Sequence, residues 1–123
     1  MTDKEYRQQK KRVERLVKKW RELLWLNNYR IHNSWARDTK DGAKNTGAET
    51  EMRWQYLEAD FTWYLPNVLE LKDDELEDMV VHEFCHILVD PLMHEDTEHG
   101  RMIYERVTTT LQRAISGVYE AKK

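Results

Sequence analysis

The 123-residue chain has few of the residues that point to a secreted, fibrous or membrane protein. Its single cysteine excludes an internal disulfide and is typical of a reducing compartment, and we expect Cys85 to be a small core residue rather than a metal ligand. With four glycines and two prolines, the chain has no low-complexity tract and no internal repeat. The first twenty residues are too charged for a secretory signal, and no apolar run approaches the length of a membrane span. We therefore expect a cytoplasmic protein without a membrane partner, either cellular or encoded by a virus of such a cell.

A strong net charge is also absent. The net charge of -3 gives no general attraction to nucleic acid or to anionic membranes. The basic run Lys10-Lys11-Arg12 is followed by acidic residues, which favours a solvated helix face, so we do not expect a nucleic-acid partner. The length fits one domain, residues 1–123, and 40% hydrophobic residues are enough to form a core.

Hydrophobic periodicity predicts a small α+β domain. Apolar residues recur every three or four positions in residues 4–27, which predicts an amphipathic N-terminal helix. Alternation in residues 29–35 and 56–65, with a separate short strand around Met52, predicts a small three-stranded twisted sheet that ends at Pro66. The strand at residues 56–65 has one apolar and one polar face. It could pair with an extended peptide or be an ordinary sheet strand, and the sequence leaves both open.

The next predicted helix contains the strongest functional signal. It opens at the acidic residues 73–75, whose side chains suit free N–H groups, and ends at Asp90-Pro91. Within it, His82 and His86 are four residues apart, so both imidazoles lie on one face and can bind one cation. Glu83 is rotated from His82 by about 100°, where it can reach a metal-bound water instead of the metal. This His-Glu-x-x-His pattern is the signature of zinc hydrolases.

A catalytic zinc site needs a third protein ligand and leaves a fourth position for water. The downstream candidates are Asp90, His94, Glu95, Asp96, Glu98, His99 and Glu105. Eighteen residues separate His86 from Glu105, enough for the helix to end, the chain to reverse and a last helix (residues 97–118) to bring Glu105 back rigidly. That helix carries an apolar stripe, formed by Ile103, Val107, Leu111, Ala114, Ile115 and Val118, with Glu105 beside it. We predict His82, His86 and Glu105 as metal ligands, with His99 as the alternative third ligand.

The motif with a helical Glu105 resembles the gluzincin metallopeptidases, and the small size resembles their single-domain minigluzincins and similar phage and prokaryotic proteins. The resemblance covers the strand at residues 56–65, the motif helix and Glu105-Arg106-Val107. It implies a zincin-like domain, a Zn²⁺ cofactor and a peptide or protein substrate, in the host cytoplasm if a phage encodes the chain. His82, His86 and Glu105 would hold the zinc, and Glu83 would act as general base and acid for a metal-activated water.

The chain departs from the gluzincin pattern at one position. Many gluzincins carry an acidic residue four positions after the glutamate ligand, where it orients a ligand histidine, but this chain has Thr109 there. The orienting partner is therefore open, as is the group that stabilises the oxyanion, for which Tyr104, His94 and His99 are candidates. The resemblance also suggests a latent form in which the tail, residues 116–123, occupies the cleft.

Two alternatives to a gluzincin-like peptidase remain. His99-Gly100 resembles the SprT-like proteases, which supply a third histidine and act on proteins bound to DNA. A non-catalytic zinc-fold protein that binds or regulates a partner is the other, although such a protein has no need of Glu83 as a proton shuttle. The metzincin pattern is excluded, because Val89 and Leu92 stand where its glycine and third histidine belong. The sequence leaves the substrate and the oligomeric state open.

Overall fold

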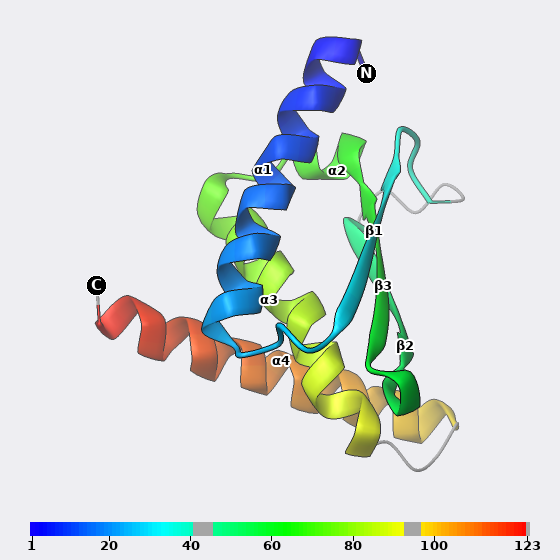
Figure 1. Ribbon diagram of the computed structural model, residues 1–123, viewed down its shortest axis with the longest axis vertical. Helices are drawn as coiled ribbons and strands as arrows, with labels where there is room; N and C mark the ends of the chain where they lie inside the picture. Colours follow the sequence, from blue (N-terminus) through cyan, green and yellow to red (C-terminus); the bar gives the residue numbers. More distant parts are fainter. Residues whose placement is uncertain (41–45, 93–96, 123) are drawn as a thin grey trace.

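A computed structural model describes residues 1–40, 46–92 and 97–122. The elements are α1 (Asp3–Leu23), β1 (Arg30–Ala36), β2 (Ala48–Arg53), β3 (Glu58–Tyr64), α2 (Leu65–Leu69), α3 (Asp73–Val89) and α4 (Glu98–Ala121), with 3₁₀ turns η1 (Trp54–Tyr56) and η2 (Asp90–Leu92). The predicted α+β architecture is confirmed: an N-terminal helix, a three-stranded sheet, the motif helix and a long C-terminal helix (Figure 1). Within the described ranges, no helix combines the length and the apolarity needed to cross a bilayer.

The strands form a mixed sheet in the order β1-β3-β2. β3 pairs in parallel with β1 and antiparallel with β2, so both of its edges are occupied. The strand that the sequence offered for peptide pairing, residues 56–65, is therefore central and not available. β1 and β2 are the two edge strands, and β2 contacts α3, the helix that carries the motif.

The alternation that predicted β3 places its side chains correctly in the structure, with one exception. Ala59, Phe61 and Trp63 point inward and are fully buried. Leu57 was expected on the same face, but its side chain is 41% exposed. Its backbone lies in the left-handed region with φ of 53°, because it forms the turn between η1 and β3 rather than part of the strand.

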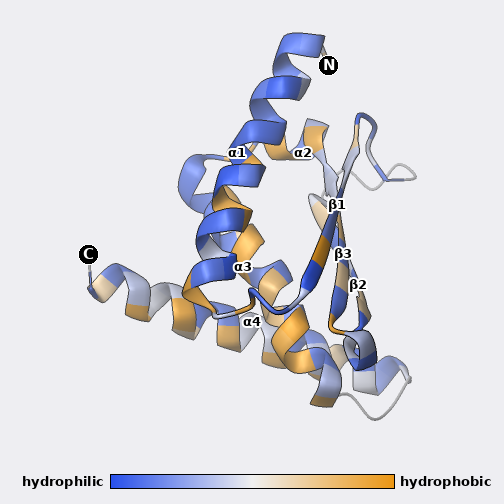
Figure 2. Ribbon diagram, in the orientation of Figure 1, coloured by the Kyte–Doolittle hydropathy of each residue, from blue (hydrophilic) through white to orange (hydrophobic). Residues whose placement is uncertain are grey.

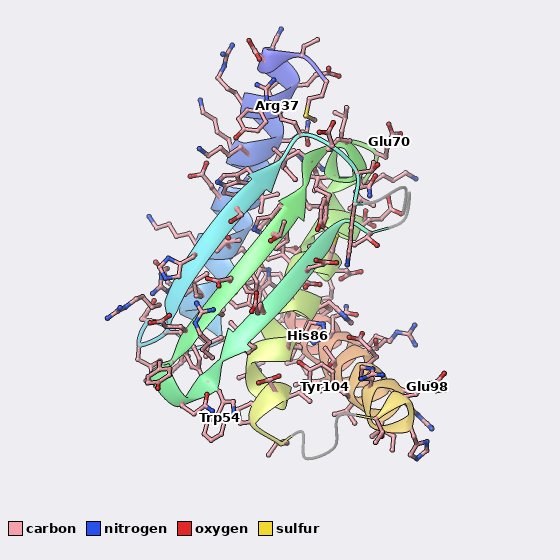
Figure 3. The ribbon with its side chains drawn as sticks, turned by 90° about the vertical axis from the view of Figure 1, so that its right-hand side faces the viewer. Arg37, Trp54, Glu70, His86, Glu98 and Tyr104 are labelled. Carbon is pink, nitrogen blue, oxygen red and sulfur yellow. The ribbon has the colours of Figure 1, made fainter. Side chains whose placement is uncertain are left out.

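The core lies between the inner face of the sheet and the helices α1 and α3. Phe61 is at its centre, with its ring 5.4 Å from that of Trp63 and 5.2 Å from that of Phe84, both edge to face. α1 adds Val13, Val17 and Trp20 from one stripe of an otherwise hydrophilic helix (Figure 2). In the part of the chain that the structure describes, no helix covers the outer face of the sheet (Figure 3).

α3 is anchored in this core on several sides. Val80, Val81, Phe84 and Ile87 are buried, and so is Cys85, which confirms it as a core residue. The first turn is closed by Glu75, whose Oε1 accepts a hydrogen bond of 2.9 Å from the backbone N–H of Lys72. The motif on the last turns of α3 is therefore held on a rigid, well-packed helix.

α4 runs back across α3 (Figure 1), but it does not bury the whole apolar stripe that the sequence suggested. Leu111 and Ile115 pack against the core, whereas Ile103, Val107 and Val118 are 49%, 45% and 58% exposed. The helix is rotated so that a neighbouring stripe faces inward, formed by Tyr104, Thr108, Leu111, Ile115 and Tyr119. The helix therefore turns a partly polar stripe toward α3 in place of the most apolar one, because Tyr104 and Glu105 contact α3.

The last helix extends beyond residue 118, where the sequence predicted its end. α4 continues to Ala121, and nothing lies within 4 Å of the position that a Cβ on Gly117 would take. The tail proposed to cover the cleft begins at residue 116, which lies about 16 Å along the helix axis from Glu105. Its described part, residues 116–122, is instead the end of α4, where the ring of Tyr119 packs 5.1 Å from that of Trp20.

Replacing the central core residue tests this packing. We expect Phe61→Ala to lower the free energy of unfolding by about 3–5 kcal/mol, because it removes a fully buried ring and leaves a cavity between the sheet and α3. Urea denaturation followed by tryptophan fluorescence measures the change. Tyr56→Ala, at a side chain that is 75% exposed, is the control and should change the value by less than about 1 kcal/mol. Equal effects of the two substitutions would contradict the assigned core.

Candidate metal centre

Three of the predicted ligands meet where α4 crosses the C-terminal half of α3. The rings of His82 and His86 are 4.9 Å apart and almost perpendicular, at 89°. The carboxylate of Glu105 lies between them, with Oε2 3.4 Å from His82 Nε2 and Oε1 3.5 Å from His86 Nε2. One ligand atom from each of the three residues lies within 4.8 Å of the others.

These separations fit a zinc ion. Zn–N and Zn–O bonds of about 2.0–2.1 Å in a tetrahedron place neighbouring ligand atoms about 3.3–3.4 Å apart. The two nitrogen–oxygen distances, 3.4 and 3.5 Å, run to different oxygens of the Glu105 carboxylate and are close to this edge length, and one ligand atom from each residue lies within 4.8 Å of the others. Two imidazoles and a carboxylate are also a donor set used by catalytic zinc sites, which leave the fourth position open.

The other candidate ligands that the structure describes, Asp90, Glu98 and His99, are not part of this cluster. His99 is exposed in the first turn of α4. It is six positions before Glu105, which separates the two residues by about 9 Å along the helix axis and about 120° around it. Asp90 lines the site, and burial raises its pKa, but it is not among the converging groups. Across residues 1–40, 46–92 and 97–122, the His82, His86 and Glu105 group alone meets the geometry for a metal. His94, Glu95 and Asp96 lie outside the described residues.

Glu83 is a buried carboxyl directly beside the ligand cluster. Glu83 is only 5% exposed, and its Oε1 accepts a hydrogen bond of 2.7 Å from the Thr50 hydroxyl on β2. Burial raises its pKa to about 7, with a smaller contribution from the charge of Glu105, while the Thr50 hydrogen bond acts in the opposite direction. A carboxyl with this pKa can both accept and release a proton near neutral pH.

The two buried neighbours of Glu83 have different roles. Burial, together with the proximity of His82, lowers the pKa of His86 to about 4, so its imidazole is neutral at pH 7 and keeps a lone pair for a cation. Burial raises the pKa of Cys85 to about 12. Cys85 is therefore a protonated thiol inside the core and not a ligand.

Tyr104 has a contact that the sequence did not predict. Its hydroxyl oxygen lies 2.9 Å from His86 Nδ1, and the two rings are stacked with centroids 5.1 Å apart. The sequence pointed to position 109 for the residue that orients a ligand histidine, but Thr109 stands there. Tyr104 was a candidate only for stabilising the oxyanion. Its position next to Glu105 was the available signal, because adjacent helical residues differ by about 100° and can reach neighbouring parts of one site.

An open groove of about 460 Å³ gives access to the cluster. Its walls are Ala48, Glu49 and Thr50 from β2, His82, Glu83, His86 and Asp90 from the end of α3, and Tyr104 and Glu105 from α4. Figure 3 shows His86 and Tyr104 beyond the edge of β2, where α3 meets α4. The groove therefore joins the ligand cluster to an exposed sheet edge.

Comparison of the chain with protein-family models, with curated proteins and with solved structures finds no match. The functional reading therefore rests on the motif and on the geometry of its residues.

The choice between Glu105 and His99 can be tested by zinc titration against a chelating dye. We expect Glu105→Ala to weaken zinc binding by at least about 100-fold, because it removes a metal ligand. Removing only a residue that hydrogen-bonds to a ligand typically weakens binding by about 10–100-fold. His99→Ala should bind zinc as the wild type does. The reverse pattern, with zinc binding lost in His99→Ala and kept in Glu105→Ala, would assign the third ligand to His99.

The raised pKa of Glu83 makes the metal-free protein less stable as the pH rises. Below pH 4.5 the carboxyl is protonated in both states; between pH 4.5 and about 7 it ionises first in the unfolded chain, so the free energy of unfolding falls. Above pH 7 the penalty is complete and amounts to about 3 kcal/mol. We expect Glu83→Gln to stabilise the chelator-treated protein by up to this amount at pH 8 and to have little effect at pH 4.5.

Urea denaturation at the two pH values measures this difference. Glu51→Gln, at an exposed carboxylate on β2, is the matched control and should leave the pH dependence as it is. If Glu83→Gln is no more stable than the wild type at pH 8, then ionisation of Glu83 does not lower the free energy of unfolding, and the prediction is wrong.

Proposed function

We propose that this protein is a zinc-dependent metallopeptidase that hydrolyses peptide bonds, with Glu83 as the proton carrier. One observation carries the proposal: His82, His86 and Glu105 converge to within 4.8 Å at the edge of a groove. Beside them lies a buried carboxyl, Glu83, whose pKa is about 7. A ligand cluster and an adjacent proton acceptor are the two parts that water-mediated hydrolysis of an amide requires.

His82, His86 and Glu105 are the residues that would hold Zn²⁺, and the ion would supply Lewis-acid polarisation of the scissile carbonyl and of a water molecule. The chain then has to move one proton. The Thr50 hydroxyl holds Oε1 of Glu83, which leaves Oε2 to accept a proton from water as the water oxygen attacks the carbonyl carbon. Glu83 returns this proton to the amine nitrogen as the carbon–nitrogen bond breaks, so it ends the cycle in its starting form.

The substrate class that best suits the groove is an extended peptide. β2 pairs with β3 on one side only, and Ala48, Glu49 and Thr50 of this edge strand line the groove. A peptide that adds to a free strand edge is held by backbone hydrogen bonds, largely independent of its side chains. A peptide on β2 would bring a backbone carbonyl to the ligand cluster and to Glu83.

The two alternatives have less support. In the described residues His99 is exposed on another side of α4 and away from the cluster, which disfavours the SprT-like arrangement. A non-catalytic zinc protein would gain nothing from Glu83, because a buried carboxyl with a raised pKa weakens the folded state.

Metal analysis combined with a peptide-library digest tests the proposal. We expect wild type and Glu83→Gln to bind zinc alike, and Glu83→Gln to lose at least about 100-fold in kcat/KM, because the amide that replaces the carboxyl cannot accept the proton. Glu98→Gln, at an exposed carboxylate on α4, is the matched control and should cleave as the wild type does.

Two results would overturn the proposal. A wild-type protein that binds zinc but leaves the whole library intact would indicate a binding or regulatory protein. Cleavage by Glu83→Gln at the wild-type rate would show that another group carries the proton.

A further inference from the structure

The phenol oxygen of Tyr104 has two neighbours on the same histidine. It lies 2.9 Å from Nδ1 of the His86 ring and 3.3 Å from the backbone carbonyl oxygen of His86. Both contacts are hydrogen bonds only if the single hydroxyl proton of Tyr104 goes to the carbonyl oxygen, because that oxygen can only accept. The phenol oxygen is then left as an acceptor for Nδ1, which must carry the ring proton.

This arrangement determines the tautomer of His86. A neutral imidazole has one protonated nitrogen, so a proton on Nδ1 leaves Nε2 with a free lone pair. Nε2 is the atom that faces Glu105, at 3.5 Å from its Oε1. The opposite tautomer would place a proton between Nε2 and the ligand cluster and would block metal binding at that nitrogen.

The phenol is itself held in position by its surroundings. The ring of Tyr104 stacks on the His86 ring at an interplanar angle of 25°. One turn further along α4, the hydroxyl of the fully buried Thr108 donates a hydrogen bond of 2.7 Å to the Tyr104 carbonyl oxygen. Because Tyr104 and Glu105 are consecutive, the placement of α4 that brings the carboxylate to Nε2 also brings the phenol to Nδ1.

We propose that Tyr104 is a positioning residue that fixes His86 in the Nδ1–H tautomer and aims its Nε2 at the metal position. Tyr104 thereby orients a ligand histidine, the role that an acidic residue has in many gluzincins at the position where this chain has Thr109. The importance of this role for catalysis rests on the proposed zinc peptidase function, but the tautomer itself exists without metal or substrate.

Long-range ¹H–¹⁵N correlation spectra of ¹⁵N-histidine-labelled, metal-free protein at pH 7.5 give the test. In the wild type we expect His86 to show a protonated Nδ1 and an unprotonated Nε2. In Tyr104→Phe, which keeps the stacked ring and removes only the hydroxyl, we expect His86 to shift toward the Nε2–H form while His82 keeps its pattern. We also expect the affinity for Zn²⁺, measured by dye competition, to fall about 10–100-fold.

Tyr56→Phe removes the hydroxyl of a tyrosine that is 75% exposed and is the matched control, which should change neither spectrum nor affinity. Thermal melting of each variant separates the tautomer effect from a loss of folding. An Nε2–H tautomer in the wild type, or a Tyr104→Phe protein with an unchanged His86 pattern, would overturn the assignment. If instead the tautomer is as expected and the wild type cleaves no peptide, the positioning role stands and the peptidase function fails.

Discussion

The structure depends on how α4 crosses α3. At this crossing, one carboxylate on α4 must reach two imidazoles that lie one helical turn apart on α3, and Glu105 does so at 3.4 and 3.5 Å. The site does not stabilise this crossing by itself. Burial raises the pKa of Glu83 and lowers the pKa of His86. Such shifts mean that the folded state disfavours their charged forms. The stabilising packing must come from elsewhere, namely from the buried side of α3 against the sheet and from Leu111, Ile115 and Tyr119 of α4.

Site and scaffold therefore share the same two helices. On α3, Phe84, Cys85 and Ile87 are buried in the same turns that carry the motif, whereas on α4 the apolar contacts lie in the C-terminal part and Glu105 in the N-terminal part. Without a metal, the buried ionisable groups of the site oppose folding. A cation bound by His82, His86 and Glu105 would reverse this sign, because it binds the folded protein and not the unfolded chain. In the absence of the ion, the packed core keeps the Glu105 carboxylate 3.4 and 3.5 Å from the two imidazoles.

The sequence predicts those parts of this arrangement that depend on local periodicity. Alternation identified Ala59, Phe61 and Trp63 as an inward-facing row, and the spacing of His82 and His86 fixed their common face. The sheet order was not accessible, because nothing local distinguishes a central strand from an edge strand, and β3 was for this reason a candidate for peptide binding. The rotation of α4 was predicted only in part. An apolar count favours a stripe through Ile103 and Val107, whereas contacts of Tyr104 and Glu105 with α3, remote in sequence, select the stripe beside it.

The same reasoning explains why the motif alone understates the site. Two side chains of the motif are each contacted by a hydroxyl from another element. The Thr50 hydroxyl of β2 donates a hydrogen bond to Glu83, and the Tyr104 hydroxyl of α4 contacts the ring of His86. Neither hydroxyl has a fixed sequence distance from the motif, so only the tertiary structure reveals them. Thr50 also belongs to the edge strand that would pair with a peptide. In the proposed reaction, the strand that aligns the substrate and the side chain that orients the proton carrier are thus one rigid unit, so a peptide bound along β2 is in register with Glu83. In that proposed reaction, alignment of this kind would lower the barrier by removing the entropy of bringing the reacting groups together.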